Sequence, residues 1–192
     1  MKKGNTRTLV GIALLTAVVV VLQLLGSFIR FGTFSVSLVL IPIAVGAALY
    51  GWIAGAWLGL AFGITVLLSG DASVFLVVHP LETVLVVLVK GILAGLISGA
   101  VYKAFEKINA FFATVAAAIV CPLVNTGVFL IGCYFFFMDV VQGIANSIGF
   151  QGSVYTYLIV GFVGLNFLFE LLFNIVLSPT VVRIIKLGKK SA

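Results

Sequence analysis

Long apolar runs, broken by short polar segments, follow one another along the whole chain. A helix that crosses the hydrocarbon core of a bilayer needs about 20 mostly apolar residues. Unbroken runs of this kind favour helices over the alternating apolar and polar positions of a membrane β-barrel strand. The pattern predicts six helices, at about residues 8–28, 37–50, 52–68, 81–105, 110–137 and 154–185.

The composition places these helices in a membrane. The 192 residues are 63% hydrophobic and 8% charged, and the mean hydropathy is +1.36. Because a soluble domain carries about 25% charged residues, this chain has too few charges to cover a surface in water. We expect an all-α integral membrane protein in which residues 1–192 form a single six-helix domain. The low share of charged residues argues against a soluble enzyme, a disordered chain and a nucleic-acid-binding domain. The net charge of +6 mostly reflects the basic ends of membrane helices.

The basic residues indicate the orientation of the helices. With six spans, one side of the membrane receives Lys2, Lys3, Arg7, Lys103, Lys107, Arg183, Lys186, Lys189 and Lys190. Arg30 falls in a loop on the other side, and Lys90 falls inside a span. Loops rich in Lys and Arg stay in the cytoplasm, so we expect both termini to be cytoplasmic.

Small residues recur at every fourth position in several of the predicted helices. The third helix carries Gly51, Gly55, Gly59 and Gly63, and the fourth carries Gly91, Gly95 and Gly99. This spacing puts them on one stripe, where small residues let helices approach closely in lipid. The stripes indicate a tightly packed bundle core or a sliding or docking surface. On the first helix, Ala13 and Ala17 are a candidate site for docking a partner protein.

Polar residues inside apolar spans are the best candidates for function, because ionisable groups cost free energy in a bilayer. Lys90 lies in the fourth helix and Glu170 in the sixth, where Asn166, Glu170 and Asn174 are spaced by four. The fifth helix adds Asn125 and Thr126. We expect a common region formed by Lys90, Asn125, Thr126, Asn166 and Glu170.

Two compatible interpretations apply to this region: a buried Lys90–Glu170 ion pair, and a small-molecule pocket with polar groups among apolar walls. A ligand carboxylate would compete for Lys90, and ligand hydroxyl or amide groups would suit the Asn side chains and Glu170. The candidate walls are Phe129, Tyr134, Phe135, Phe136, Tyr155, Tyr157, Phe162 and Phe167.

No pattern of catalytic residues accompanies the polar spans. The chain has one histidine, His79, and it lacks the His-Glu-x-x-His and Gly-x-Ser-x-Gly motifs and a phosphate-binding glycine loop. Asp71 and Asp139 fall in outer loops and in principle form an acid pair, although solvated carboxylates are the simpler interpretation. We expect no enzyme activity, metal site or cofactor.

Four segments, which contain most of these polar residues, carry a family resemblance: Leu40-Ile41-Pro42-Ile43 leading to Gly46, the stretch 89–95 around Lys90, the stretch 121–127 around Asn125, and Asn166-Phe167-Leu168-Phe169-Glu170. The chain resembles the substrate-binding S components of energy-coupling factor (ECF) vitamin transporters, most of all the pantothenate-type members. The resemblance implies a six-helix protein of a prokaryotic plasma membrane whose Ala13 and Ala17 meet a transmembrane T component. Two partner ATPases supply the energy.

The expected function is therefore binding of a vitamin, with pantothenate the best candidate, from outside the cell for ATP-driven uptake. Residues 69–80 are expected to act as a lid. In the family, uptake involves toppling of the whole S component. The alternatives are an S component for another vitamin or precursor, a self-sufficient secondary carrier or channel, and a membrane enzyme that uses Asp71 and Asp139.

Overall fold

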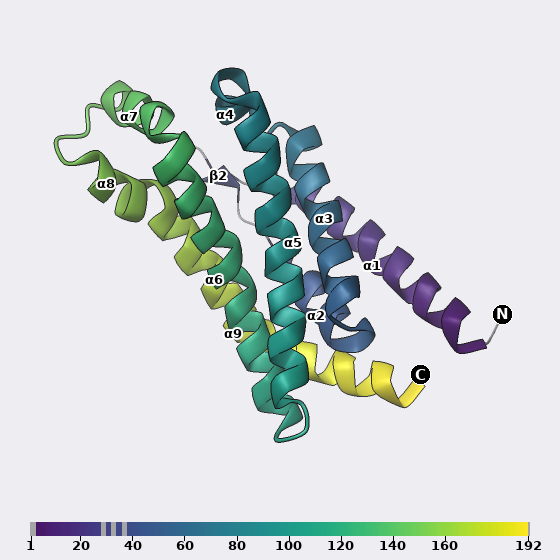
Figure 1. Ribbon diagram of the computed structural model, residues 1–192. Helices are drawn as coiled ribbons and strands as arrows, with labels where there is room; N and C mark the ends of the chain where they lie inside the picture. The colour runs from purple at the N-terminus through teal and green to yellow at the C-terminus, as the bar shows by residue number, and fades with distance from the viewer. Residues whose placement is uncertain (1–2, 28–29, 32–33, 36–37, 192) are drawn as a thin grey trace.

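The computed structural model describes residues 3–27, 30–31, 34–35 and 38–191, and it shows a helical bundle with one short hairpin (Figure 1). The helices are α1 (Lys3–Gly26), α2 (Leu40–Tyr50), α3 (Trp52–Ser69), α4 (Ser73–Val78), α5 (Pro80–Phe105), α6 (Ala110–Phe136), α7 (Met138–Ser147), α8 (Val154–Thr156), the π-helix η1 (Tyr157–Gly164) and α9 (Leu165–Ser191). The antiparallel strands β1 (Arg30–Phe31) and β2 (Phe34–Ser35) form the hairpin. The all-helical fold class predicted from the sequence is confirmed.

The apolar runs coincide with the long helices, with three differences. Helices α4 and α7 occupy segments that were expected to be loops. The last run is divided into α8, η1 and α9, and α9 continues beyond the expected end at residue 185. Helix α2 begins at Leu40, and residues 36–37 lie outside the part of the chain that the structure describes.

Four helical segments are long and apolar enough to cross a membrane: Thr6–Gly26, Trp52–Ser69, Pro80–Phe105 and Ala110–Phe136. Two further apolar helical segments, Leu40–Tyr50 and Phe167–Leu177, are shorter. The structure therefore establishes several membrane-spanning candidates.

The glycine stripes of α3 and α5 pack against each other. A Cβ added at Gly59 would overlap the carbonyl of Gly91, and a Cβ at Gly55 would overlap that of Gly95. The pairing runs in opposite directions along the chain, so the two helices are antiparallel and their backbones touch. Of the two interpretations of the stripes, the packed bundle core is the one that the structure shows for these glycines.

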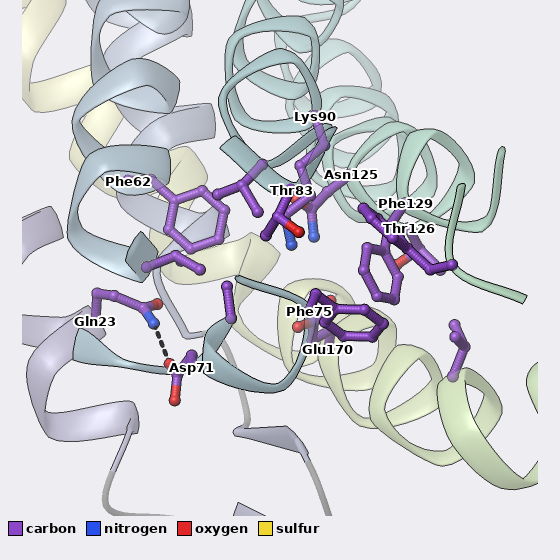
Figure 2. A pocket seen from close by; sticks show the side chains of 15 residues that line it. Gln23, Phe62, Asp71, Phe75, Thr83, Lys90, Asn125, Thr126, Phe129 and Glu170 are labelled. Atoms are coloured by element: carbon purple, nitrogen blue, oxygen red, sulfur yellow. Dashed lines mark hydrogen bonds between the residues drawn. The ribbon is translucent and has the colours of Figure 1, made fainter. Parts of the chain in front are cut away.

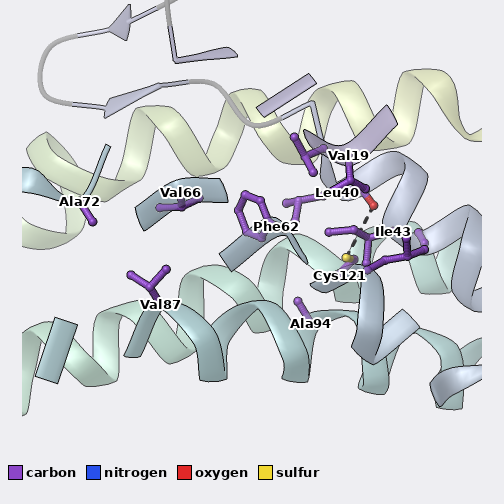
Figure 3. Close-up of a cluster of buried hydrophobic side chains, with 12 residues drawn as sticks. Val19, Leu40, Ile43, Phe62, Val66, Ala72, Val87, Ala94 and Cys121 are labelled. Atoms are coloured by element: carbon purple, nitrogen blue, oxygen red, sulfur yellow. Dashed lines mark hydrogen bonds between the residues drawn. The ribbon is translucent and has the colours of Figure 1, made fainter. Parts of the chain in front are cut away.

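Apolar side chains from several helices meet beside this glycine contact (Figure 3). Val19 of α1, Ile43 of α2 and Phe62 of α3 are almost completely buried there. Cys121 of α6 joins them and donates a weak hydrogen bond to the carbonyl of Leu40, with 3.7 Å between sulfur and oxygen. Helices α1, α2, α3, α5 and α6 thus share one core.

The two ends of the bundle are built differently. Helices α4 and α7 lie at one end, whereas the start of α1, the end of α9 and the α5–α6 turn lie towards the other (Figure 1). The short helices enclose a separate apolar cluster that includes Phe75, Phe137 and Val141. This end is where a cavity opens among the helices.

Candidate functional site

A cavity of about 70 Å³ lies among the long helices and is lined at one place by Phe75 of α4 (Figure 2). A single water needs about 10–15 Å³ by the same kind of measure, so the cavity has room for several waters. Its lining comes from α1, the α3–α4 turn, α3, α4, α5, α6, η1 and α9, and comprises Gln23, Phe62, Val66, Asp71, Ala72, Phe75, Thr83, Val87, Lys90, Asn125, Thr126, Phe129, Phe137, Val163 and Glu170. Apolar and aromatic walls with a few polar groups are typical of a small-molecule site.

Four of the five residues proposed from the sequence line this cavity. Lys90 comes from α5, Asn125 and Thr126 come from α6, and Glu170 comes from α9. The fifth, Asn166, belongs to α9, but its side chain lies outside the part that the structure describes. The packing of α5, α6 and α9 therefore brings the described candidates to one cavity.

The Lys90 ammonium lies between two aromatic rings. Its Nζ is 5.1 Å from the ring centroid of Phe129 and 5.8 Å from that of Phe62. Rings at these distances attract a cation through their π-electrons. Among the described residues, no hydrogen-bond acceptor or ion-pair partner contacts the ammonium, so the Lys90–Glu170 ion pair, one of the two interpretations of this region, is not formed. The N–H groups of Lys90 are therefore available to a ligand or to water.

Asn125 also has hydrogen-bonding capacity that the described residues do not use. Its side chain is 5% exposed, and its Oδ1 has no hydrogen-bond partner there. A buried amide left in this state costs free energy, and a water or a ligand N–H or O–H in the cavity would recover it.

On α9, Asn174 donates to the backbone carbonyl of Glu170 at 2.7 Å, so this member of the predicted stripe supports its own helix.

Sequence reasoning missed one polar pair of the cavity. The Gln23 amide nitrogen donates to Asp71 Oδ2 at 2.6 Å, and Ser27 donates to the same oxygen at 2.8 Å. Asp71 is therefore more than a solvated loop carboxylate, because it lines the cavity and is hydrogen-bonded to Gln23 of α1. A lone amide within the apolar run Thr6–Gly26 was the signal in the sequence that pointed to Gln23.

The aromatic walls differ from those expected. Phe129 lines the cavity as predicted, whereas Tyr134, Phe135, Phe136 and Tyr155 are exposed on the outside of the bundle. Tyr157 and Phe167 belong to the neighbouring apolar cluster, and the side chain of Phe162 lies outside the described part. The other aromatic rings of the wall are Phe62, Phe75 and Phe137.

The segment 69–80 contains α4, which covers one end of the cavity. Phe75 of α4 is 5% exposed. Its ring packs edge-on against that of Phe129, with 5.7 Å between the ring centroids, and at a tilt against that of Phe137, with 5.0 Å between the centroids. Directly after α4, His79 Nε2 contacts Asp139 Oδ2 of α7 at 2.9 Å. The aromatic contacts and this hydrogen bond hold α4 against α6 and α7.

Asp71 and Asp139 do not form an acid pair, because each has its own partner. Asp71 is bonded to α1, and Asp139 is bonded to His79. The hydrogen bond from His79 is the main reason why the pKa of Asp139 lies below its usual 3.8. Across the described residues, no group of three or more His, Cys, Asp or Glu side chains could hold a metal ion.

The two faces of α1 differ in exposure. Val19 and Gln23 are buried against the bundle, whereas Ala13 and Ala17 are exposed on the outside. Ala13 borders a surface groove that Tyr50 and Trp57 also line. The two alanines therefore lie on a surface that a partner could reach.

The family model described as "ECF transporter, substrate-specific component" matches residues 7–182 of the chain. Comparisons with curated proteins and with solved structures gave no match. The matched range contains the cavity and nearly all of the helical bundle. Proteins of this family are transport subunits and not enzymes; they bind a small molecule and work with a T component and ATPases. The chain belongs to the family of substrate-specific components of ECF transporters.

Proposed function

We propose that this S component binds a vitamin from outside a prokaryotic cell, and that pantothenate is the best candidate. The cavity between the helices carries this proposal, because it combines the ammonium of Lys90 with the amide of Asn125 inside an aromatic wall. Pantothenate has a carboxylate for Lys90, an amide for Asn125 or Glu170, and hydroxyl groups. Its transfer into the cell would use a T component and two ATPase subunits.

The proposed topology has six spans and cytoplasmic termini. The four long apolar helices supply four spans, and the shorter α2 and the α8–η1–α9 segment would supply the other two. The basic residues at both ends of the chain and in the α5–α6 turn would then share the cytoplasmic side. This orientation directs α4 and α7, and hence the cavity, towards the outside.

In the same proposal, α4 acts as the lid of the binding site and α1 as the docking helix. Phe75 lies where a moving α4 would open or close the cavity. The exposed Ala13 and Ala17 allow close approach of a helix from the T component. Docking would thus use the outer face of α1, whereas the inner face of the same helix contributes Gln23 to the cavity.

Reconstitution of the purified chain tests this function against a self-sufficient carrier. The proposal predicts that the chain in liposomes binds pantothenate without accumulating it, even under an ion gradient, and that added T and ATPase subunits with ATP restore uptake. Uptake driven by the gradient alone would identify a secondary carrier. Mass spectrometry of small molecules that co-purify with the chain distinguishes pantothenate from another vitamin.

A further inference from the structure

The cavity has a second polar end, formed by Gln23 of α1 and Asp71 of the α3–α4 turn. The two side chains are hydrogen-bonded to each other, and both line the cavity. They lie together and apart from Lys90 and Asn125 (Figure 2). Polar groups therefore face the cavity from two separate places. Thr83, Thr126 and Glu170 also line it, and aromatic and aliphatic side chains make up the rest of its wall.

The chemistry of the two ends is opposite. Lys90 has three N–H donors and no acceptor, so its end suits an anionic group. An ionised Asp71 only accepts hydrogen bonds, and Gln23 adds an amide oxygen that also accepts. The Asp71 end therefore suits hydroxyl, amide or ammonium groups that donate hydrogen bonds.

The position of Gln23 indicates a role beyond joining α1 to the α3–α4 turn. Ser27, which follows directly after α1, already donates to Asp71 Oδ2 and is not among the described residues that line the cavity. Gln23 makes a second bond to the same oxygen from a side chain that is 2% exposed and faces the cavity. Burying an amide in an apolar membrane helix is unfavourable unless it has partners, and the cavity supplies room for one.

We propose that Gln23 and Asp71 bind the hydrogen-bond-donating end of the ligand and so select a bipolar substrate. Such a substrate carries a carboxylate at one end, for Lys90, and hydroxyl or amine donors at the other, for Asp71. This inference rests on the proposed function, since it assumes that the cavity is the vitamin site. Pantothenate meets the requirement through its carboxylate and its hydroxyl groups.

Two probes test the donor end directly: pantothenate, and N-(3,3-dimethylbutanoyl)-β-alanine, which keeps the carboxylate and amide but lacks the hydroxyls. Binding of each is measured by calorimetry on the full chain in nanodiscs. The wild type should prefer pantothenate by about ten- to a hundredfold, as expected for hydrogen bonds to a charged group. In Asp71→Asn and Gln23→Leu this preference should fall to within about threefold, mainly through loss of pantothenate affinity.

Ser27→Ala is the matched control, because it removes a bond to Asp71 from outside the cavity. It should keep the wild-type preference. An equal loss of affinity for both probes in the Asp71 and Gln23 variants would overturn the proposal and leave a purely structural pair, with the vitamin site intact.

If the wild type binds neither probe, pantothenate is excluded as the ligand, and the co-purifying molecule identified by mass spectrometry becomes the probe. If this molecule is lost from Asp71→Asn but still co-purifies with Ser27→Ala, the result would support the proposal that Asp71 binds the ligand. If the molecule still co-purifies with Asp71→Asn, the proposal would be overturned.

Discussion

The ammonium of Lys90 in α5 lies over the ring of Phe129 in α6 at the wall of the cavity, with 5.1 Å between the ammonium and the ring centroid. Because none of the described residues accepts a hydrogen bond from this ammonium, its charge is available to an anionic ligand. We expect Lys90→Gln to weaken pantothenate binding by about ten- to a hundredfold, the range for a hydrogen bond to a charged group. Calorimetry on the purified chain measures the change. Lys103→Gln, in the exposed last turn of the same helix, is the control and should bind normally. Unchanged affinity in Lys90→Gln would remove Lys90 from the site.

Asn125 should show opposite effects on stability and on binding. Its Oδ1 is buried without a partner among the described residues, so Asn125→Leu removes an unfavourable polar group from the ligand-free protein. We expect the variant to unfold at an equal or higher temperature and to bind pantothenate about tenfold more weakly. Thermal scanning with and without ligand measures both. The control is Thr114→Val, which alters a buried residue of α6 that bonds within its own helix. Full affinity in Asn125→Leu would show that the amide does not contact the ligand.

The close contact between α3 and α5 predicts a strong effect of one methyl group. A Cβ at Gly59 would overlap the Gly91 carbonyl, so Gly59→Ala must push the two helices apart. We expect a loss of about 1–3 kcal/mol in the free energy of unfolding, the usual cost of overpacking. Gly127→Ala is the matched control, because a Cβ there meets no atom within 4 Å and alanine favours a helix. Equal thermal midpoints for the two variants would contradict the tight packing.

The hydrogen bond between His79 and Asp139 predicts that the stability of the fold depends on pH. The pKa of Asp139 is lower in the folded protein than its usual 3.8. The hydrogen bond with His79 therefore stabilises the fold fully above pH 3.8, and this stabilisation is lost as the pH falls through the pKa that Asp139 has in the folded protein. We expect Asp139→Ala to lower the unfolding temperature at about pH 5 and to have a progressively smaller effect as the pH falls below 3.8. A difference that persists at the lowest pH would mean that the carboxylate charge is not involved.

Opening of α4 should also become faster when the same bond is removed. His79→Ala frees the end of α4 from α7 while leaving the cavity lining unchanged. We expect faster dissociation of the bound vitamin in a stopped-flow experiment, with a smaller effect on the association rate. Identical dissociation rates in variant and wild type would argue against α4 as the lid.

The exposed face of α1 predicts a separation of binding from assembly. Ala17→Trp places a large side chain on the outer surface, so ligand binding should stay normal while the complex with the T component is lost. Co-purification of the chain with its partners measures assembly. Ile131→Trp, on the exposed surface of α6, is the control. An intact complex with Ala17→Trp would move the docking surface elsewhere.

Sequence reasoning found the site residues that stand out against an apolar background and missed those that do not. Lys90, Asn125 and Glu170 were predictable because polar groups within a membrane helix require a reason. Asp71 was hidden because a carboxylate in a loop has a simple alternative, solvation. The aromatic walls were misplaced because phenylalanine occurs throughout the chain, and exposure to lipid and exposure to a cavity select the same residue type. The folding of short loops into α4 and α7 depends on tertiary contacts such as Phe75 with Phe137.

The carbonyl-to-glycine contact of α3 with α5 leaves no side-chain layer between the two helices that could deform. These helices must therefore move as one rigid unit, which includes Phe62 and Lys90. Any conformational change that accompanies binding or release of the ligand must then occur in the elements around this rigid unit. Distance measurements between spin labels on α3 and α5 should accordingly stay constant through the transport cycle, while those to α4 change.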